Sequence, residues 1–164
     1  MWQQHSKDIS QGIRSELLNA PTGSIYTALM EEQVTLITSL PLDAAQRVHS
    51  LVKETMITGY RSSEVKKEIL RTEQVSESKA RLIARTEVAR SAATFTQARA
   101  EYAGSEGYIW RTSKDSDVRP LHQEMEGKFV LWTKPPKLEP SLAPYHAGCG
   151  PNCRCFAEPV LPDL

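Results

Sequence analysis

Cysteine is scarce in this sequence of 164 residues, and net charge and long hydrophobic runs are missing altogether. The three cysteines are an odd number, which excludes a fully paired disulfide framework within one chain. Lysine plus arginine and aspartate plus glutamate both total 20, so the formal net charge is zero. This balance argues against a histone-like protein and against a polybasic membrane-surface protein, because both depend on long-range charge attraction.

Membrane and export signals are also missing from the sequence. No apolar stretch approaches the roughly 20 residues that a membrane-spanning helix needs. Residues 1–8 lack the apolar core of a signal peptide. We therefore expect cytoplasmic synthesis, no membrane partner, and one domain or one domain plus an appendage.

The first two thirds of the chain predict helices. Residues 1–23 are polar and end in a breaker cluster, which predicts a short helix or a loose arm. Apolar residues then recur at helical spacing through residues 24–104 and predict a helical body. Its first helix is expected to run from Ser24 to Pro41, and its second from about Asp43 to Gly59.

Two further helices complete the predicted body. Ser62 or Ser63 is expected to cap a short helix. Ser76 is the predicted cap of the longest helix, from Glu77 to about Tyr102. No proline or glycine interrupts this run, and a glycine at position 104 is expected to end it.

The composition changes at Gly104, because eight of the ten prolines and five of the eight glycines lie from this residue onward. Strands are predicted at 108–112, at 129–132 and at 155–158, and Pro159 is expected to end the last one. An irregular arm is expected at 135–140. Residues 105–164 are thus a small Cys/His-containing β subdomain. The predicted fold class is α+β: a mainly helical N-terminal body with a long helix, followed by a small irregular β-containing C-terminal subdomain.

The residues that suit a metal ion gather in this subdomain. Cys149, Cys153 and Cys155 lie within seven residues, His146 just precedes them, and His122 lies upstream. Thiolates and imidazoles are the ligands that zinc prefers, and a structural zinc site takes four of them. These five residues are therefore candidate ligands of a structural zinc ion. In the alternative interpretation, the last two cysteines are ordinary small residues of a strand.

The run from Asp115 to His122 combines carboxylates, a guanidinium and an imidazole. Such a set is compatible with a hydrolytic or phosphate-binding centre. We favour a structural interpretation, in which Asp115 and Asp117 cap a short helix starting near Val118 and Arg119 pairs with an acid.

A third polar segment, Arg85 to Arg90, lies in the middle of the long helix. Glu87 and Arg90 are three residues apart and can pair on one helix face. The favoured interpretation is a solvated face with an ion pair. The alternative is a polar anchor that orients the C-terminal subdomain against the helix. The candidate anchor residues are Arg85, Glu87, Asp115, Arg119 and Arg154.

Several short motifs follow one another in order over roughly residues 25–161. They are Ala84-Arg85-Thr86-Glu87, Trp110-Arg111-Thr112, the 115–122 run, Gly127, and Asn152-Cys153-Arg154-Cys155 with Glu158-Pro159. Together they resemble the phage Mu F-like head morphogenesis proteins, also called minor head proteins. Some members of that family carry a C-x-x-C pair where this chain has Arg119 and His122. Here His146 and Cys149 are expected to compensate.

The resemblance implies a virion component of a tailed phage or prophage. Such a protein associates with the portal protein and other head proteins, and it influences head assembly, DNA packaging or DNA ejection. It is expected in the host cytoplasm during assembly and then in the virion, at the capsid interior or the portal vertex. Relatives are often longer at the N-terminus, so the chain is expected to be a fragment or a short form.

Three functions follow from these observations. The leading hypothesis is an assembly protein of the phage head whose helical body is the docking surface and which has no enzymatic activity. The alternative is a metal-dependent hydrolase or nuclease that uses Asp115, His122 and His146. The third is a DNA-contacting module, which the interleaved glutamates weaken. Its basic residues are Lys66, Lys67, Arg71, Lys79, Arg81 and Arg85.

Overall fold

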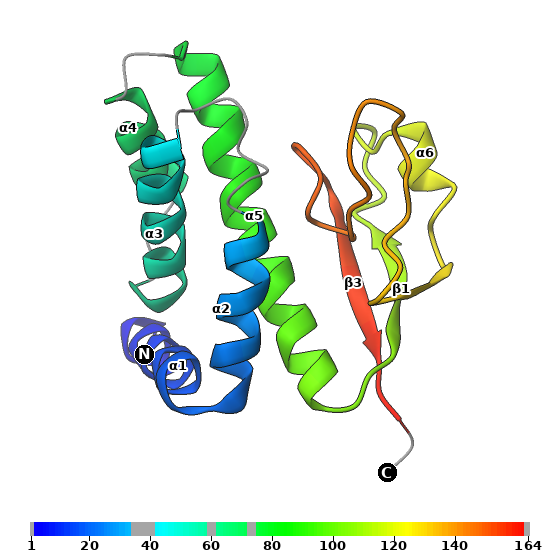
Figure 1. The fold of residues 1–164 in the computed structure, drawn as a ribbon, viewed down its shortest axis with the longest axis horizontal. Helices are drawn as coiled ribbons and strands as arrows, with labels where there is room; N and C mark the ends of the chain where they lie inside the picture. Colours follow the sequence, from blue (N-terminus) through cyan, green and yellow to red (C-terminus); the bar gives the residue numbers. More distant parts are fainter. Residues whose placement is uncertain (1, 34–41, 59–61, 72–74, 163–164) are drawn as a thin grey trace.

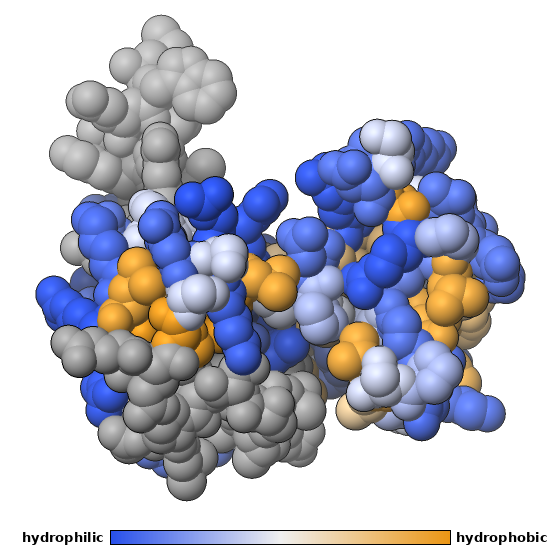
Figure 2. Space-filling model, turned by 90° about the horizontal axis from the view of Figure 1, so that it is seen from above, coloured by the Kyte–Doolittle hydropathy of each residue, from blue (hydrophilic) through white to orange (hydrophobic). Residues whose placement is uncertain are grey.

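A computed structural model describes residues 2–33, 42–58, 62–71 and 75–162 of the chain. The described residues form a helical part and a C-terminal part that lie on opposite sides of one long helix, α5 (Glu77–Tyr102) (Figure 1). A three-stranded antiparallel sheet follows α5, so the α+β prediction is confirmed. Seen from above, a hollow separates the two parts (Figure 2).

The helical part consists of α1–α4 packed against each other and against α5 (Figure 1). Residues 2–19 form a helix that contacts the next two helices. Of the two alternatives expected for this segment, the helix is therefore observed and not the loose arm. Proline is tolerated at the first position of a helix because its missing N–H would have no partner there, and Pro21 begins α2. The elements are α1 (Trp2–Asn19), α2 (Pro21–Gln33), α3 (Leu42–Thr58) and α4 (Ser62–Leu70).

Both predicted ends of the long helix are confirmed, whereas α2 begins at Pro21 and not at the predicted Ser24. The Ser76 side chain accepts a hydrogen bond from the Lys79 backbone N–H at 3.4 Å, which caps α5 as expected. Gly104 has a φ of +84°, the left-handed conformation that favours glycine just past a helix. The predicted stops at Pro41 and Gly59 lie outside the described residues.

The C-terminal part contains β1 (Gly107–Thr112), α6 (Pro120–Gln123), β2 (Phe129–Leu131) and β3 (Cys155–Val160). The strand order is β2-β1-β3, and both pairs are antiparallel. The prediction that Pro159 ends the third strand is wrong, because this residue pairs with Tyr108 and the strand continues. Among the described strands, β3 lies at the edge of the sheet beside β1, and edge strands tolerate proline.

Each part has its own hydrophobic core. The core of the helical part is mostly aliphatic, with Val48, Val52 and Val65 fully buried. The second core lies between the inner face of the sheet, α5 and the loop over residues 132–151. Aromatic rings dominate it, and the rings of Tyr108 and Trp132 pack at a tilt of 34° with centroids 4.4 Å apart. None of the described helices is long and apolar enough to cross a membrane.

Candidate functional site

Three of the five predicted metal ligands meet in the C-terminal part. His122 comes from α6, Cys155 is the first residue of β3, and Cys153 lies in the turn before that strand. The Nδ1 atom of His122 is 3.6 Å from the Cys153 sulfur and 3.4 Å from the Cys155 sulfur. All three candidate ligand atoms lie within 4.8 Å of one another. We call these three residues the sulfur–histidine cluster.

The other nitrogen of His122 is held by polar neighbours. Nε2 lies 2.9 Å from the Tyr145 hydroxyl and 3.3 Å from a carboxylate oxygen of Glu139. Tyr145 also donates a hydrogen bond to Glu139, and Arg119 pairs with the same carboxylate at 2.9 Å. The ring of Trp110 meets the imidazole edge to face at 5.7 Å. These contacts hold the buried imidazole so that Nδ1 faces the two sulfurs.

The two thiols of the cluster have unequal affinities for a proton. A hydrogen bond from the Cys155 side chain lowers the pKa of Cys153, and backbone N–H groups of Gly148 and Cys155 act in the same direction. The same side-chain hydrogen bond raises the pKa of Cys155. The surroundings therefore stabilise a thiolate at Cys153.

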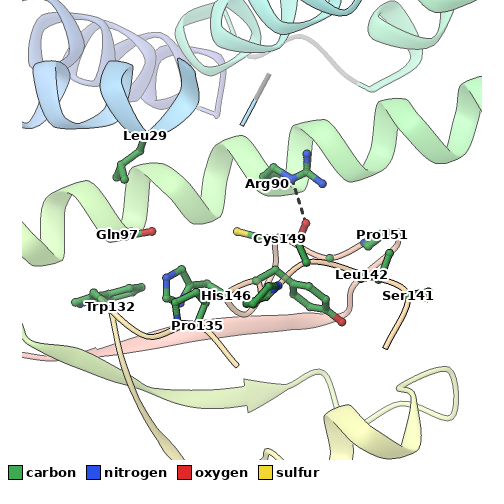
Figure 3. Close-up of a pocket in the computed structure, with 14 residues that line it drawn as sticks. Leu29, Arg90, Gln97, Trp132, Pro135, Ser141, Leu142, His146, Cys149 and Pro151 are labelled. Atoms are coloured by element: carbon green, nitrogen blue, oxygen red, sulfur yellow. Dashed lines mark hydrogen bonds between the residues drawn. The ribbon is translucent and has the colours of Figure 1, made fainter. Parts of the chain in front are cut away.

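The other two predicted ligands, His146 and Cys149, are not part of the cluster. Both line a cavity of about 580 Å³ between α2, α5 and the 132–151 loop (Figure 3). The Nδ1 atom of His146 lies 3.2 Å from the Tyr108 hydroxyl, and burial lowers the pKa of this histidine to about 4. Burial raises the pKa of the Cys149 thiol to about 12. Both side chains are thus held as neutral groups near pH 7.

Polar side chains of α5 join the helix to the C-terminal part. Arg90 pairs with Glu87 at 2.9 Å, and both side chains are at most 8% exposed. The Nε–H of Arg90 also donates to the carbonyl of Cys149 at 3.1 Å (Figure 3). One helical turn earlier, Thr86 Oγ1 accepts a hydrogen bond from the backbone N–H of Asn152 at 3.0 Å. The favoured interpretation of this segment as a solvated face is therefore wrong, because the pair is buried.

The residues of α5 that contact the C-terminal part differ in part from the predicted anchor residues. Arg85, a predicted anchor, is exposed, whereas Thr86 and Arg90 make the contacts. Their spacing is a signal that could have found them. Thr86, Arg90 and Ala93 are four and three residues apart and so share one helix face. A Cβ on Gly148 would come within 3.0 Å of Ala93, so the loop meets this face closely.

The remaining predicted anchors connect loops within the C-terminal part. Asp115 accepts hydrogen bonds from Ser113 and from the Asp117 backbone, and it pairs with Arg154 at 2.7 Å. The prediction that these aspartates cap a helix near Val118 is wrong. The helix there is α6, which Arg119 precedes without a side-chain cap. The predicted pairing of Arg119 with an acid is confirmed, since its partner is Glu139.

Two alternatives from the sequence find little support in the geometry. Within the described residues, Asp115 and His146 do not join His122 in one cluster, so the hydrolytic arrangement is not assembled. The basic residues proposed for DNA contact have acidic neighbours along α4 and α5, as Lys66 does with Glu77 at 2.5 Å. Similar pairs are Lys67–Glu64, Arg71–Glu68 and Arg81–Glu77.

Comparison with known proteins identifies the family. The Phage Mu protein F like family matches residues 46–158, which include the α5 anchor residues and the sulfur–histidine cluster. The chain belongs to this family. The match confirms the resemblance seen in the motifs and indicates a phage head-related protein.

One curated relative shares most of the chain. It is an uncharacterized protein of Haemophilus influenzae (strain ATCC 51907 / DSM 11121 / KW20 / Rd), 31% identical over 134 residues. The match covers 82% of this chain and 29% of the relative, so the chain spans less than a third of that protein's length. No solved structure matches the chain.

Proposed function

We propose that this protein is a minor head protein of a tailed phage or prophage, which binds the portal during head assembly and acts in DNA packaging or ejection. The observation that carries the proposal is the family match over residues 46–158. On this proposal the protein is made in the host cytoplasm and ends in the virion, at the capsid interior or portal vertex.

The way in which the two parts are joined supports an attachment role. The matched region begins in α3 and ends in β3, so it includes helices, sheet and the contacts between them. Thr86 and Arg90 are on α5, and their partners Asn152 and Cys149 are in the last loop. Two hydrogen bonds between segments roughly sixty residues apart, one of them from a buried arginine, keep the C-terminal part in one position on α5. A protein held in this way offers partners a surface of constant shape.

The outer face of the sheet offers such a surface. Direct cross-strand partners share a face, and Ile109 pairs with Phe129, while Arg111 pairs with Phe156. Phe129 is 51% exposed and Phe156 is 54% exposed. Leu131 and Val160, which both pair with Gly107, are also exposed on this face. Exposed apolar side chains grouped on one face are typical of protein interaction sites. We therefore propose that the portal contact lies on the outer sheet face rather than on the helical body expected from the sequence.

Co-purification tests the proposal. Procapsids are prepared with the portal protein and with this protein carrying an affinity tag, and the two proteins are then purified together. We expect the portal oligomer to be retained with the tagged protein. Absence of this protein from both procapsids and virions would contradict the head function.

Matched variants locate the contact surface. Phe129→Glu and Phe156→Glu place a charge on the outer sheet face, and we expect each to lower portal retention by about tenfold or more. Leu82→Glu is the control, because Leu82 is an exposed apolar residue of α5, outside the sheet. Equal loss with Leu82→Glu, or no loss with either phenylalanine variant, would move the docking surface away from the sheet.

A further inference from the structure

We infer that His122, Cys153 and Cys155 bind one soft divalent cation, of which zinc is the natural candidate, and that they leave one coordination position for an external donor. The sequence alone predicted five candidate ligands and a closed structural site. The structure supports a smaller ligand set with a different coordination type. This inference does not depend on the head function.

The distances match those of a tetrahedral zinc site. With Zn–S near 2.3 Å and Zn–N near 2.0–2.1 Å, neighbouring nitrogen and sulfur ligands of a tetrahedron lie roughly 3.6 Å apart. The Nδ1 atom of His122 lies 3.6 Å from one sulfur and 3.4 Å from the other. Both nitrogen–sulfur distances are therefore close to those of a tetrahedral site.

The surroundings of His122 are those of a metal-bound histidine. A ligating histidine usually donates its second ring N–H to a carboxylate or a carbonyl, which sets the tautomer and the ring orientation. Here Glu139 and Tyr145 lie at Nε2, on the far side of the ring from the sulfurs. This arrangement leaves Nδ1 available as the ligand atom. Arg119 in turn holds the Glu139 carboxylate.

The surroundings of the two sulfurs offer N–H donors, which would stabilise the thiolates that a bound metal requires. Backbone N–H groups of Gly148 and Cys155 donate to Cys153. The indole N–H of Trp110 is buried, makes no hydrogen bond within the described residues, and lies near the Cys155 sulfur. A metal-bound thiolate at Cys155 would give that orphaned N–H a negatively charged acceptor.

The number of converging ligands decides the type of site. A closed structural zinc site uses four protein ligands, whereas three protein ligands leave a position for water or another donor. Among the described residues, three ligand atoms converge. Cys153 is half-buried between the exposed Asn152 and Arg154, so solvent reaches this side of the cluster. The third cysteine, Cys149, accepts a hydrogen bond from Arg90 at its backbone carbonyl, and it lines the separate cavity.

Metal stoichiometry tests the ligand set. The full chain is purified without chelator, and zinc is measured by elemental analysis together with the number of thiols that iodoacetamide modifies. We expect one zinc ion per chain and protection of Cys153 and Cys155. Cys153→Ser and His122→Gln should weaken zinc binding roughly a hundredfold or more, and Glu139→Gln by about 10–100-fold. Cys149→Ala and His146→Gln are the matched controls and should keep one zinc ion.

The open position is tested on the unmodified protein with cobalt(II), so that the result does not depend on whether a variant folds. Cobalt(II) should give thiolate-to-metal charge-transfer bands and the intense visible bands of a tetrahedral ion. Added imidazole should shift the visible bands, because it enters the fourth position. Unchanged bands would overturn the open position. Absence of metal binding, rapid alkylation of Cys153 in the presence of zinc, or equal zinc loss in the two control variants would overturn the site itself.

Discussion

The two parts of this protein are stabilised by different kinds of interaction. The helical part buries aliphatic side chains at helical spacing, and its core needs few polar contacts. The C-terminal part has a short sheet and many prolines, and its core combines aromatic rings with thiols and a buried histidine. There, polar contacts hold the loops, such as the one that Tyr108 makes with the backbone N–H of Ala147. The helical part, with its regular apolar periodicity, is therefore stabilised mainly by burial of apolar side chains. The C-terminal part depends more on specific polar contacts between its loops.

The largest expected effect is at the junction of the two parts. Arg90→Ala leaves the buried Glu87 carboxylate without its partner, and burial already raises the pKa of this group. Loss of one partner of a buried ion pair costs about 3–5 kcal/mol of unfolding free energy. Urea unfolding measures it, with tryptophan fluorescence in a Trp2→Phe background, so that only Trp110 and Trp132 report. The double variant Glu87→Gln/Arg90→Ala should recover part of the loss; no recovery would contradict the role of the pair.

The second prediction concerns the aliphatic core alone. Ile69 in α4 is fully buried, and truncation to alanine should lower the unfolding free energy by about 2–5 kcal/mol. Far-UV circular dichroism during urea unfolding is the measurement. Leu82→Ala, at an exposed position of α5, should change stability by about 0.5 kcal/mol or less. Similar losses for the two variants would show that burial does not dominate the helical part.

The third prediction is a pH dependence confined to the C-terminal part. His146 has a folded pKa of about 4, below its ordinary value of 6.5, because burial disfavours the charged imidazole. As pH falls below 6.5, His146 binds a proton in the unfolded chain but stays neutral in the folded chain. The stability present above pH 6.5 is therefore lost progressively toward pH 4, by up to about 3 kcal/mol. His146→Gln should flatten this part of the stability profile, and an unchanged slope would assign it to other groups.

The fourth prediction sharpens the account of the anchor. Thr86→Val keeps the shape of the side chain but removes the acceptor for the Asn152 N–H. We expect a loss of about 1 kcal/mol, the usual contribution of one hydrogen bond. Hydrogen exchange should show faster exchange at the Asn152 amide and little change in α1–α4. The Arg85→Ala control, at an exposed position, should leave that amide unchanged.

The smallest predicted effect concerns the contact of α1 with α5. A hydrogen bond from Arg99 lowers the pKa of Glu16, and the two side chains form an ion pair. A lowered folded pKa means that the stabilisation is present above the unfolded pKa and is lost as pH falls through the folded value. Because Arg99 is 51% exposed, Glu16→Gln should cost less than about 1 kcal/mol at pH 7. The difference between wild type and variant should shrink in acid and in high salt.

The sequence predicts the two parts of the protein to different extents, for a physical reason. Helix α5 was predicted with its cap at Ser76 and its end at Gly104, because capping and apolar spacing are local signals. The extent of β3 was not predicted, because a strand at the edge of a sheet tolerates a proline such as Pro159. Only the sheet topology reveals that β3 lies at an edge. Likewise, the burial of the Glu87–Arg90 pair depends on a loop some sixty residues away.

By itself, the sequence determined the α+β class, the long helix, the change of character at Gly104, and the family through its ordered motifs. Those properties follow from apolar periodicity, helix caps and residue identity, which are local features of the sequence. Only the tertiary structure decided which of the five candidate ligands meet. It brings His122 to Cys153 and Cys155, while His146 and Cys149 turn to a cavity beside α5. The reason is that metal ligation depends on distances of a few ångströms between atoms from separate loops, and sequence spacing does not set these distances.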